Sequence, residues 1–186
     1  MSIASKQPWS SDVAGRAAKV RLVALDVDGV LTDGGIVHAD ASAGAMESKR
    51  FFVRDGLGLR LLLDQGIKVG LITARCSQLV ARRAGELKLS FVHQGVRDKR
   101  ACLAEELQRG RLTFDACAFM GDDLQDLPVL TQVGLATAPA DASPEVCERV
   151  HWVAPKGGGR GAVRDLAELV LKTQGHWDAI VARYAD

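Results

Sequence analysis

The chain has 186 residues, of which 47% are hydrophobic and 25% charged, and its formal net charge is +1 at pH 7. This length and composition are typical of one globular domain with a sizeable core. A charge so close to zero provides no field that would recruit nucleic acid or an anionic membrane. Every apolar run is shorter than the roughly 20 residues that a membrane span requires.

Residues 1–10 are expected to be disordered, and they lack the apolar core of a signal peptide. The cysteines are widely spaced and form no C-x-x-C pair, which favours free thiols in a reducing cytoplasm over a disulfide or a zinc site. They are Cys76, Cys102, Cys117 and Cys147. We therefore expect a cytoplasmic protein.

Apolar runs and turn residues alternate along the chain and predict strands and helices in turn. Strands are expected over residues 20–25, 67–72, 91–93, 116–120, 133–136 and 150–153. Helices are expected over residues 11–19, 54–65, 77–85, 98–108, 124–130 and 162–173, with a turn at 177–184. This order predicts a Rossmann-like, doubly wound α/β fold with a mostly parallel sheet, in one domain over residues 1–186.

The segment 34–53 interrupts this alternation. Gly, Ala and Ser lie between the apolar pieces Ile36–Val37 and Phe51–Val53, which predicts a small β-hairpin with a loose tip at residues 41–44. A lone hairpin with such strands would expose apolar side chains to water. We therefore expect the hairpin to pair with copies of itself in a homo-oligomer.

The glycine run 157–161 is expected to be a flexible loop. Gly157, Gly159 and Ala162 match G-x-G-x-x-A, but too little chain follows to complete a dinucleotide-binding βαβ unit. Residues 156–186 are interpreted as a tail and helix that could close over the protein's own site or a neighbour's. An ordinary surface loop before the last helix is the alternative.

Polar residues follow several of the predicted strands. They are Asp26 and Asp28 after the first strand, Thr73 and Arg75 after the second, and Asp122, Asp123 and Asp126 after the fourth, with Lys99 at the start of a helix between them. The carboxyl ends of parallel strands lie at one edge of a sheet, where open α/β folds bind ligands. Clustered carboxylates repel one another unless a cation neutralises them, and oxygen ligands suit Mg²⁺ better than zinc. Mg²⁺, a lysine and a hydroxyl group around one point would hold a phosphoryl group.

This arrangement resembles the haloacid dehalogenase-like superfamily of phosphotransferases. The resemblance rests on D-x-D-G at Asp26–Gly29, on Thr73, on Lys99, and on G-D-D-x-x-D at Gly121–Asp126, in that order. It extends over about residues 20–173. D-x-D alone is a weak signal, whereas four motifs in order, each at a strand end or helix start, are a strong one.

The resemblance implies a role for each matching residue. Asp26 is the nucleophile that forms an aspartyl-phosphate, and Asp28 is the general acid and then the general base. Mg²⁺ is held by the Asp26 carboxylate, the Asp28 backbone carbonyl and the Asp122 carboxylate. Thr73, Ala74 and Lys99 bind the phosphoryl oxygens, and Asp123 and Asp126 support the metal ligands.

No cap domain fits between Asp28 and Thr73 or between Lys99 and Asp122, so another subunit or a large substrate must cover the site. Within the capless branch, residues 26–35, 54–62, 121–128 and 157–165 resemble the 3-deoxy-D-manno-octulosonate 8-phosphate phosphatases. That resemblance implies a Mg²⁺-dependent cytoplasmic homotetramer that acts in lipopolysaccharide precursor synthesis, and the apolar 34–53 hairpin is where we expect its subunits to join. Its expected partner is a small phosphorylated sugar acid.

The substrate branch remains open at this stage, because close relatives act on nonulosonate 9-phosphates. Arg75 favours the octulosonate branch, although Ala74 replaces the glycine that is usual before it. An acidic sugar phosphate needs local cations for its carboxylate and its phosphate. The candidates are Arg54, Arg75, Lys156 and Arg160.

Several of these candidate site residues could also have a purely structural role. Asp26 and Asp28 could cap a loop, Thr73 could be an ordinary strand end, Asp126 could cap a short helix, and Lys99 could belong to a solvated helix start. At the level of function, the alternatives are a capless phosphatase that acts on a macromolecule and a non-catalytic scaffold.

Overall fold

The structure, a computed structural model, describes residues 9–38 and 47–185. Its main sheet is parallel, with strand order β5-β4-β1-β6-β7-β8. The strands are β1 (Leu22–Leu25), β4 (Lys68–Ile72), β5 (Phe91–His93), β6 (Cys117–Met120), β7 (Leu135–Ala138) and β8 (Trp152–Val153). From β1 the chain adds β4 and β5 on one side of the sheet and then crosses over to add β6, β7 and β8 on the other. Folds of this kind bind ligands at the carboxyl ends of the strands where this change of direction occurs. The expected α/β fold is confirmed.

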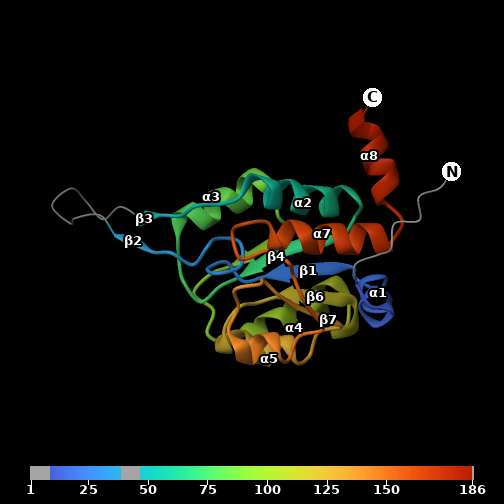
Figure 1. Ribbon diagram of the computed structural model, residues 1–186. Coiled ribbons are helices and arrows are strands. Elements are labelled where there is room, and N and C mark those ends of the chain that lie inside the picture. The colour runs from blue at the N-terminus through green and yellow to red at the C-terminus, as the bar shows by residue number, and fades with distance from the viewer. Residues whose placement is uncertain (1–8, 39–46, 186) are drawn as a thin grey trace.

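Helices cover both faces of this sheet (Figure 1). On one side lie α2 (Val53–Asp64), α3 (Gln78–Leu87) and α7 (Ala162–Thr173), and on the other α4 (Lys99–Gly110) and α5 (Leu127–Leu130). The described chain also contains α1 (Ser11–Ala17), α6 (Pro144–Cys147), α8 (Trp177–Ala185) and the short 3₁₀ turns η2 (Phe114–Ala116) and η3 (Leu124–Asp126).

Strand β1 is buried on both faces, and its side chains alternate between two cores. Val23 and Leu25 pack in the cluster that includes α2 and α7, whereas Leu22 and Ala24 pack in the cluster that includes α4 and α5. A strand buried on both sides is apolar throughout rather than alternating. The continuous apolar run before Asp26 therefore has a structural cause.

Some expected elements differ from the structure. Residues 177–184 form a helix, α8, rather than a turn. The expected helix over 124–130 is divided into η3 and α5, since Pro128, in the first turn of α5, has no backbone N–H to donate to the preceding turn. The strand expected at 133–136 lies two residues later, since the Gly134 N–H donates to the Phe114 carbonyl before β7 begins.

The hairpin is shorter than expected. Its antiparallel strands are β2 (Val37–His38) and β3 (Glu47–Ser48), and the expected loose tip lies outside the described residues. Assigning Phe51–Val53 to its second strand was wrong. Phe51 packs against the core, Phe52 is the N-cap of α2, and Val53 is the first residue of that helix. The local sequence pattern does not reveal that Phe51 packs against the core, because that contact forms only when the chain folds.

The glycine run 157–161 is packed and hydrogen-bonded rather than a free loop. The Gly159 N–H donates to the Val30 carbonyl at 2.9 Å, and the Gly158 N–H donates to Asp141 Oδ1 at 2.8 Å. The run therefore lies against the loop that follows β1. Helix α8 and the C-terminus lie at the end of the molecule opposite the hairpin (Figure 1). No helix among the described residues is both long and apolar enough to span a bilayer.

Candidate active site

Three strands deliver polar residues to one edge of the sheet. Asp26 follows β1, Thr73 follows β4, and Asp122 lies two residues beyond β6. The strands are held in register there, since the Asp26 N–H donates to the Met120 carbonyl at 3.0 Å and the Thr73 N–H donates to the His93 carbonyl at 2.9 Å. The parallel topology thus brings together residues that are almost 100 positions apart.

The centre of the site is a cluster of carboxylates around one lysine. Oxygen atoms of Asp26, Asp122 and Asp126 all lie within 4.8 Å of one another. Lys99 Nζ lies 3.0 Å from Asp26 Oδ2 and 2.7 Å from Asp126 Oδ1, and all three of these side chains are buried. The alternative of a solvated start for α4 is wrong for Lys99.

The cluster shifts the proton affinities of its members. Burial, reinforced by the charge of Asp126, raises the pKa of Asp26 to about 6. Burial, together with the charges of Asp26 and Asp126, raises the pKa of Asp122 to about 7. Burial alone would lower the pKa of Lys99, but the carboxylates of Asp26 and Asp126 outweigh it and raise that pKa. Ionising these carboxylates is therefore costly until a further positive charge is present.

The donor set fits a divalent metal ion. Among the described residues, Asp26 Oδ1 and Asp122 Oδ1 are buried and have no hydrogen-bond partner. Bare, buried carboxylate oxygens are costly unless a cation meets them. Asp126 differs, because its Oδ1 accepts from Lys99 and its Oδ2 accepts from the backbone N–H groups of Asp122, at 3.0 Å, and of Asp123. Asp26 and Asp122 thus have oxygen atoms available for Mg²⁺. Asp126 instead holds Lys99 and the loop of Asp122 in place.

Asp123 lies at the rim of the site. Its exposed side chain accepts from the Leu124 N–H at 2.8 Å and caps η3. The structure does not place its carboxylate in the cluster that Asp26, Asp122 and Asp126 form.

Gly29 allows the loops after β1 and β6 to approach each other. Its φ is +84°, and a Cβ built there would lie 2.1 Å from Asp122 Oδ2. Any side chain at this position would displace the Asp122 carboxylate. The glycine of D-x-D-G is therefore required by the geometry of the cluster.

Asp28 lies at the mouth of the site with its side chain 20% exposed. Its Oδ1 accepts a hydrogen bond from Lys49, and its Oδ2 lies 3.6 Å from Arg75 Nε. The side chain of Lys49 is only 2% exposed. Sequence reasoning missed this lysine, and its position directly after the hairpin was the one available signal.

The expected phosphate-binding residues line the same edge. Thr73 is buried, and its hydroxyl accepts from the Arg75 N–H at 3.4 Å. Its carbonyl accepts from the Val96 N–H, which places the start of α4, and so Lys99, beside it. Ala74 is exposed at the turn that follows.

The expected substrate-binding cations are dispersed. Arg75 lies at the mouth of the site, and Arg160 lines a hollow of about 520 Å³ with Arg50, Phe51, Phe52 and Gly159. Arg54 is exposed in the first turn of α2. Lys156 is paired with Asp165 at 2.5 Å, so its charge is already compensated.

Asp55 is a buried acid outside the cluster. Its Oδ1 accepts from the Arg164 N–H at 2.7 Å, at the start of α7, where the N-cap Gly161 has no side chain of its own. Burial raises the pKa of Asp55 to about 6. This carboxylate therefore caps α7 from α2 and fixes the helix that follows the glycine run.

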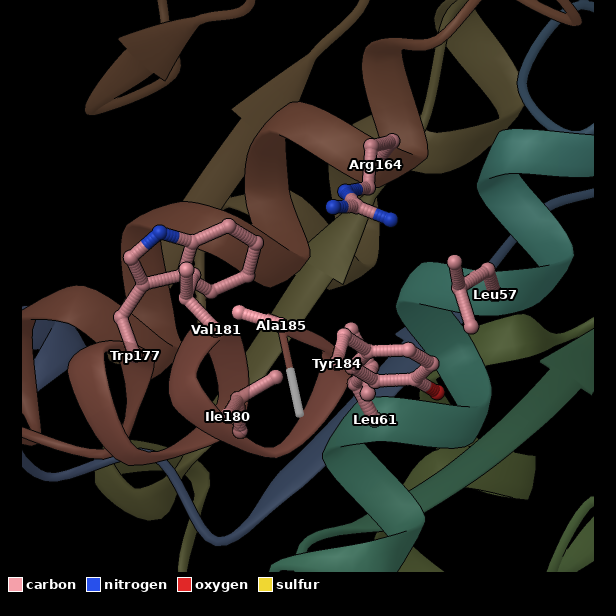
Figure 2. Close-up of a pocket in the computed structure, with 8 residues that line it drawn as sticks. All are labelled: Leu57, Leu61, Arg164, Trp177, Ile180, Val181, Tyr184 and Ala185. Atoms are coloured by element: carbon pink, nitrogen blue, oxygen red, sulfur yellow. The ribbon is translucent and has the colours of Figure 1, made fainter.

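A second hollow, of about 300 Å³, lies between α2, α7 and α8 (Figure 2). Its lining is mostly apolar, and its cation, Arg164, is bonded to Glu168 at 2.8 Å and stacked over Trp177. The residues that line it are Leu57, Leu61, Arg164, Trp177, Ile180, Val181, Tyr184 and Ala185. They include no carboxylate, unlike the cluster of Asp26, Asp122 and Asp126.

Comparison with solved structures identifies the class of protein. A Legionella pneumophila structure assigned to the HAD superfamily, subfamily III A, superposes with a TM-score of 0.87 at 38% identity, covering 94% of each chain. In the described chain, the hairpin and α2 lie between Asp28 and Thr73, and α4, η2 and β6 lie between Lys99 and Asp122. The fold and the site thus define a capless phosphatase of the haloacid dehalogenase-like superfamily.

Relatives with an assigned activity identify the family. The 3-deoxy-D-manno-octulosonate 8-phosphate phosphatase KdsC of Escherichia coli (strain K12) is 41% identical over 171 residues, which cover 92% of this chain and 89% of that protein. The Moraxella catarrhalis phosphatase of the same name, solved with magnesium, phosphate and KDO, has a TM-score of 0.89 at 36% identity and covers 93% of this chain and 98% of its own. The chain belongs to the 3-deoxy-D-manno-octulosonate 8-phosphate phosphatases, a family of phosphoric monoester hydrolases. No protein-family model matches it.

Proposed function

We propose that this protein hydrolyses 3-deoxy-D-manno-octulosonate 8-phosphate to the free sugar acid and phosphate, with Mg²⁺ bound at the carboxylate cluster. The observation that carries the proposal is the carboxylate of Asp26, whose Oδ1 is buried without a hydrogen-bond partner, whose Oδ2 lies 3.0 Å from Lys99, and which forms one cluster with Asp122 and Asp126. A buried carboxylate with one anchored and one free oxygen is arranged for attack on phosphorus. The M. catarrhalis relative, solved with magnesium, phosphate and KDO, supports the same assignment.

Each residue of the site has a role in the proposed reaction. Asp26 attacks phosphorus, and the leaving alcohol takes a proton from Asp28 as the P–O bond breaks. Asp28, now a carboxylate, takes a proton from the water that hydrolyses the aspartyl-phosphate. Mg²⁺, held by Asp26, Asp122 and the Asp28 carbonyl, would neutralise the charge of the phosphoryl group. The Thr73 hydroxyl, the Ala74 N–H and the Lys99 ammonium would bind the phosphoryl oxygens.

The assembly and the setting are also proposals. A homotetramer joined through the hairpin would cover Ile36 and Val37, which are 47% and 59% exposed in the single chain. It would also supply the cover that a capless site lacks. A role in lipopolysaccharide precursor synthesis in the cytoplasm follows from the proposed substrate. Arg54, Arg75 and Arg160 remain the candidates for its carboxylate.

A phosphate-release assay with Mg²⁺ tests this proposal. We expect turnover of 3-deoxy-D-manno-octulosonate 8-phosphate with a kcat/KM at least about tenfold above that of a nonulosonate 9-phosphate, since one misplaced substrate group costs roughly 1–3 kcal/mol. The opposite ranking would reassign the substrate. No release from either ester would leave the scaffold function as the better interpretation.

A further inference from the structure

The base of the hairpin is connected to two loops of the active site. Lys49, directly after β3, donates to Asp28 Oδ1 in the loop after β1. Glu47, within β3, accepts from the Ser77 hydroxyl at 2.7 Å, in the loop between β4 and α3. Within the segment, Lys49 Nζ lies 3.5 Å from Glu47 Oε1. One short segment outside the main sheet thus contacts both loops.

The charged side chain of Lys49 is buried, although the residue as a whole is half-buried. Its side chain is 2% exposed, and removing an ammonium group from water is unfavourable unless a carboxylate compensates it. The acceptor in closest contact is the carboxylate of Asp28, the proposed general acid. Outside a functional site, a lysine would be expected to reach solvent with its charged end.

The two oxygens of Asp28 have different environments. Oδ1 is held by Lys49, whereas Oδ2 has Arg75 Nε at 3.6 Å, beyond normal hydrogen-bond distance. Arg75 is also 48% exposed and therefore a weaker constraint. Within the described chain, these are the two cationic side chains paired with Asp28. Lys49 thus fixes one oxygen and leaves the other available.

We propose that Lys49 is a positioning residue for the phosphatase reaction, which holds Asp28 so that Oδ2 faces the leaving oxygen. The inference rests on the proposed function. In the first step the Asp26–phosphorus bond forms, the ester P–O bond breaks, and a proton carried on Asp28 Oδ2 moves to the leaving oxygen, while Lys49 stays on Oδ1 and keeps the resulting carboxylate in place for the second step. Lys49 itself forms no bond to substrate and transfers no proton.

The role predicts a particular kinetic signature. A general acid matters greatly for a poor leaving group and little for a good one. Ring-substituted phenyl phosphates vary the leaving group with little change of shape, so they separate proton donation from binding. We expect Lys49→Met to lower kcat/KM for phenyl phosphate about tenfold or more, and for p-nitrophenyl phosphate less than about threefold.

A double-mutant cycle shows whether Lys49 acts through Asp28. Asp28→Asn should steepen the dependence of rate on leaving-group pKa, and adding Lys49→Met should steepen it no further. Lys49→Arg keeps a cation and should restore the parental dependence. Lys19 is exposed and precedes β1, at the end of that strand opposite the site. Lys19→Met is therefore the matched control and should leave the dependence of rate on leaving-group pKa unchanged.

The outcomes separate this inference from the proposed function. Equal loss for every ester in Lys49→Met, or a further loss in the Asp28→Asn background, would overturn the role of Lys49 alone. A parental protein inactive on all phosphate esters would overturn both. If Lys49→Met lacks the parental circular dichroism spectrum, Lys49→Gln is measured instead, with the same expected and contrary results.

Discussion

Asp26 combines two properties that a nucleophilic carboxylate needs. Its Oδ2 is held by Lys99 at 3.0 Å, and its Oδ1 is buried without a hydrogen-bond partner. A bare oxygen alone does not distinguish Asp26, since Asp55 Oδ2 is also buried and unpaired; Asp26 differs because its carboxylate lies in the cluster with Asp122 and Asp126. The position of Asp26 within this cluster indicates where a metal ion and a phosphoryl group would approach.

Asp26→Asn keeps the shape of the side chain and removes its nucleophilic charge. We expect turnover of the sugar phosphate to fall below about a hundredth of the parental value, because an amide cannot form the acyl phosphate. Phosphate release with Mg²⁺ measures the effect, and an unchanged circular dichroism spectrum excludes unfolding. Residual activity above that level would exclude Asp26 as the nucleophile.

At the scale of elements, the glycine run is a structural part of the site. Gly158 packs so closely that a Cβ there would lie 1.8 Å from the Gly29 carbonyl oxygen. The run thus supports the loop that carries Asp28. It is held in turn by α7, which Asp55 caps from α2.

Gly158→Ala would force this run away from the β1 loop. We expect a loss of about 1–3 kcal/mol in the free energy of unfolding, as for other overpacked sites, together with a lower kcat. Urea unfolding and the phosphate-release assay measure the two effects. Gly15→Ala, where a Cβ would meet nothing within 4 Å, is the control and should cost neither stability nor activity. Parental values for Gly158→Ala would show that the packing is not required.

At the scale of the whole molecule, the raised carboxylate pKa values connect stability, pH and metal. The pKa values of Asp26 and Asp55 are raised to about 6 and that of Asp122 to about 7, mainly by burial. Because these groups bind protons more tightly when folded, their contribution to stability is full below pH 4 and is lost as the pH rises through 6 to 7. Mg²⁺ acts in the opposite direction, since it binds the ionised carboxylates.

We therefore expect the rise in melting temperature caused by Mg²⁺, relative to EDTA, to be small at about pH 5 and several degrees larger at about pH 8. Thermal unfolding at matched ionic strength measures this difference. Asp122→Asn should abolish most of it, whereas Lys19→Met should preserve it. A Mg²⁺ effect that is equal at both pH values would contradict the assignment of the cluster as the metal site.

The oligomer is tested at the same scale. Ile36→Asp combined with Val37→Asp places charges on the exposed part of the hairpin, so we expect the proposed tetramer to dissociate. Sedimentation velocity measures the change, and Leu124→Asp, a substitution of an exposed apolar residue elsewhere, serves as the control. A parental protein that sediments as a monomer would remove the proposed role of the hairpin.

The sequence by itself determined the fold class and the centre of the site. Local patterns carry this information, because a buried parallel strand must be apolar throughout and its end must change to polar residues and glycine. The runs before Asp26 and before Gly121 show that change directly. Helix α7 was predicted with its observed bounds because its apolar periodicity is strong.

Only the tertiary structure decided how distant segments meet. Lys49 contacts Asp28, and Gly158 packs on Gly29, although the members of each pair are far apart in the chain. Phe51 packs against a core that exists only once the chain has folded. A local sequence pattern cannot predict such contacts. A lysine or phenylalanine after a hairpin has the same neighbours in the sequence whether its side chain is buried or exposed. Burial and charge compensation are settled when the layers assemble, and they set the position of Asp28, the proposed general acid.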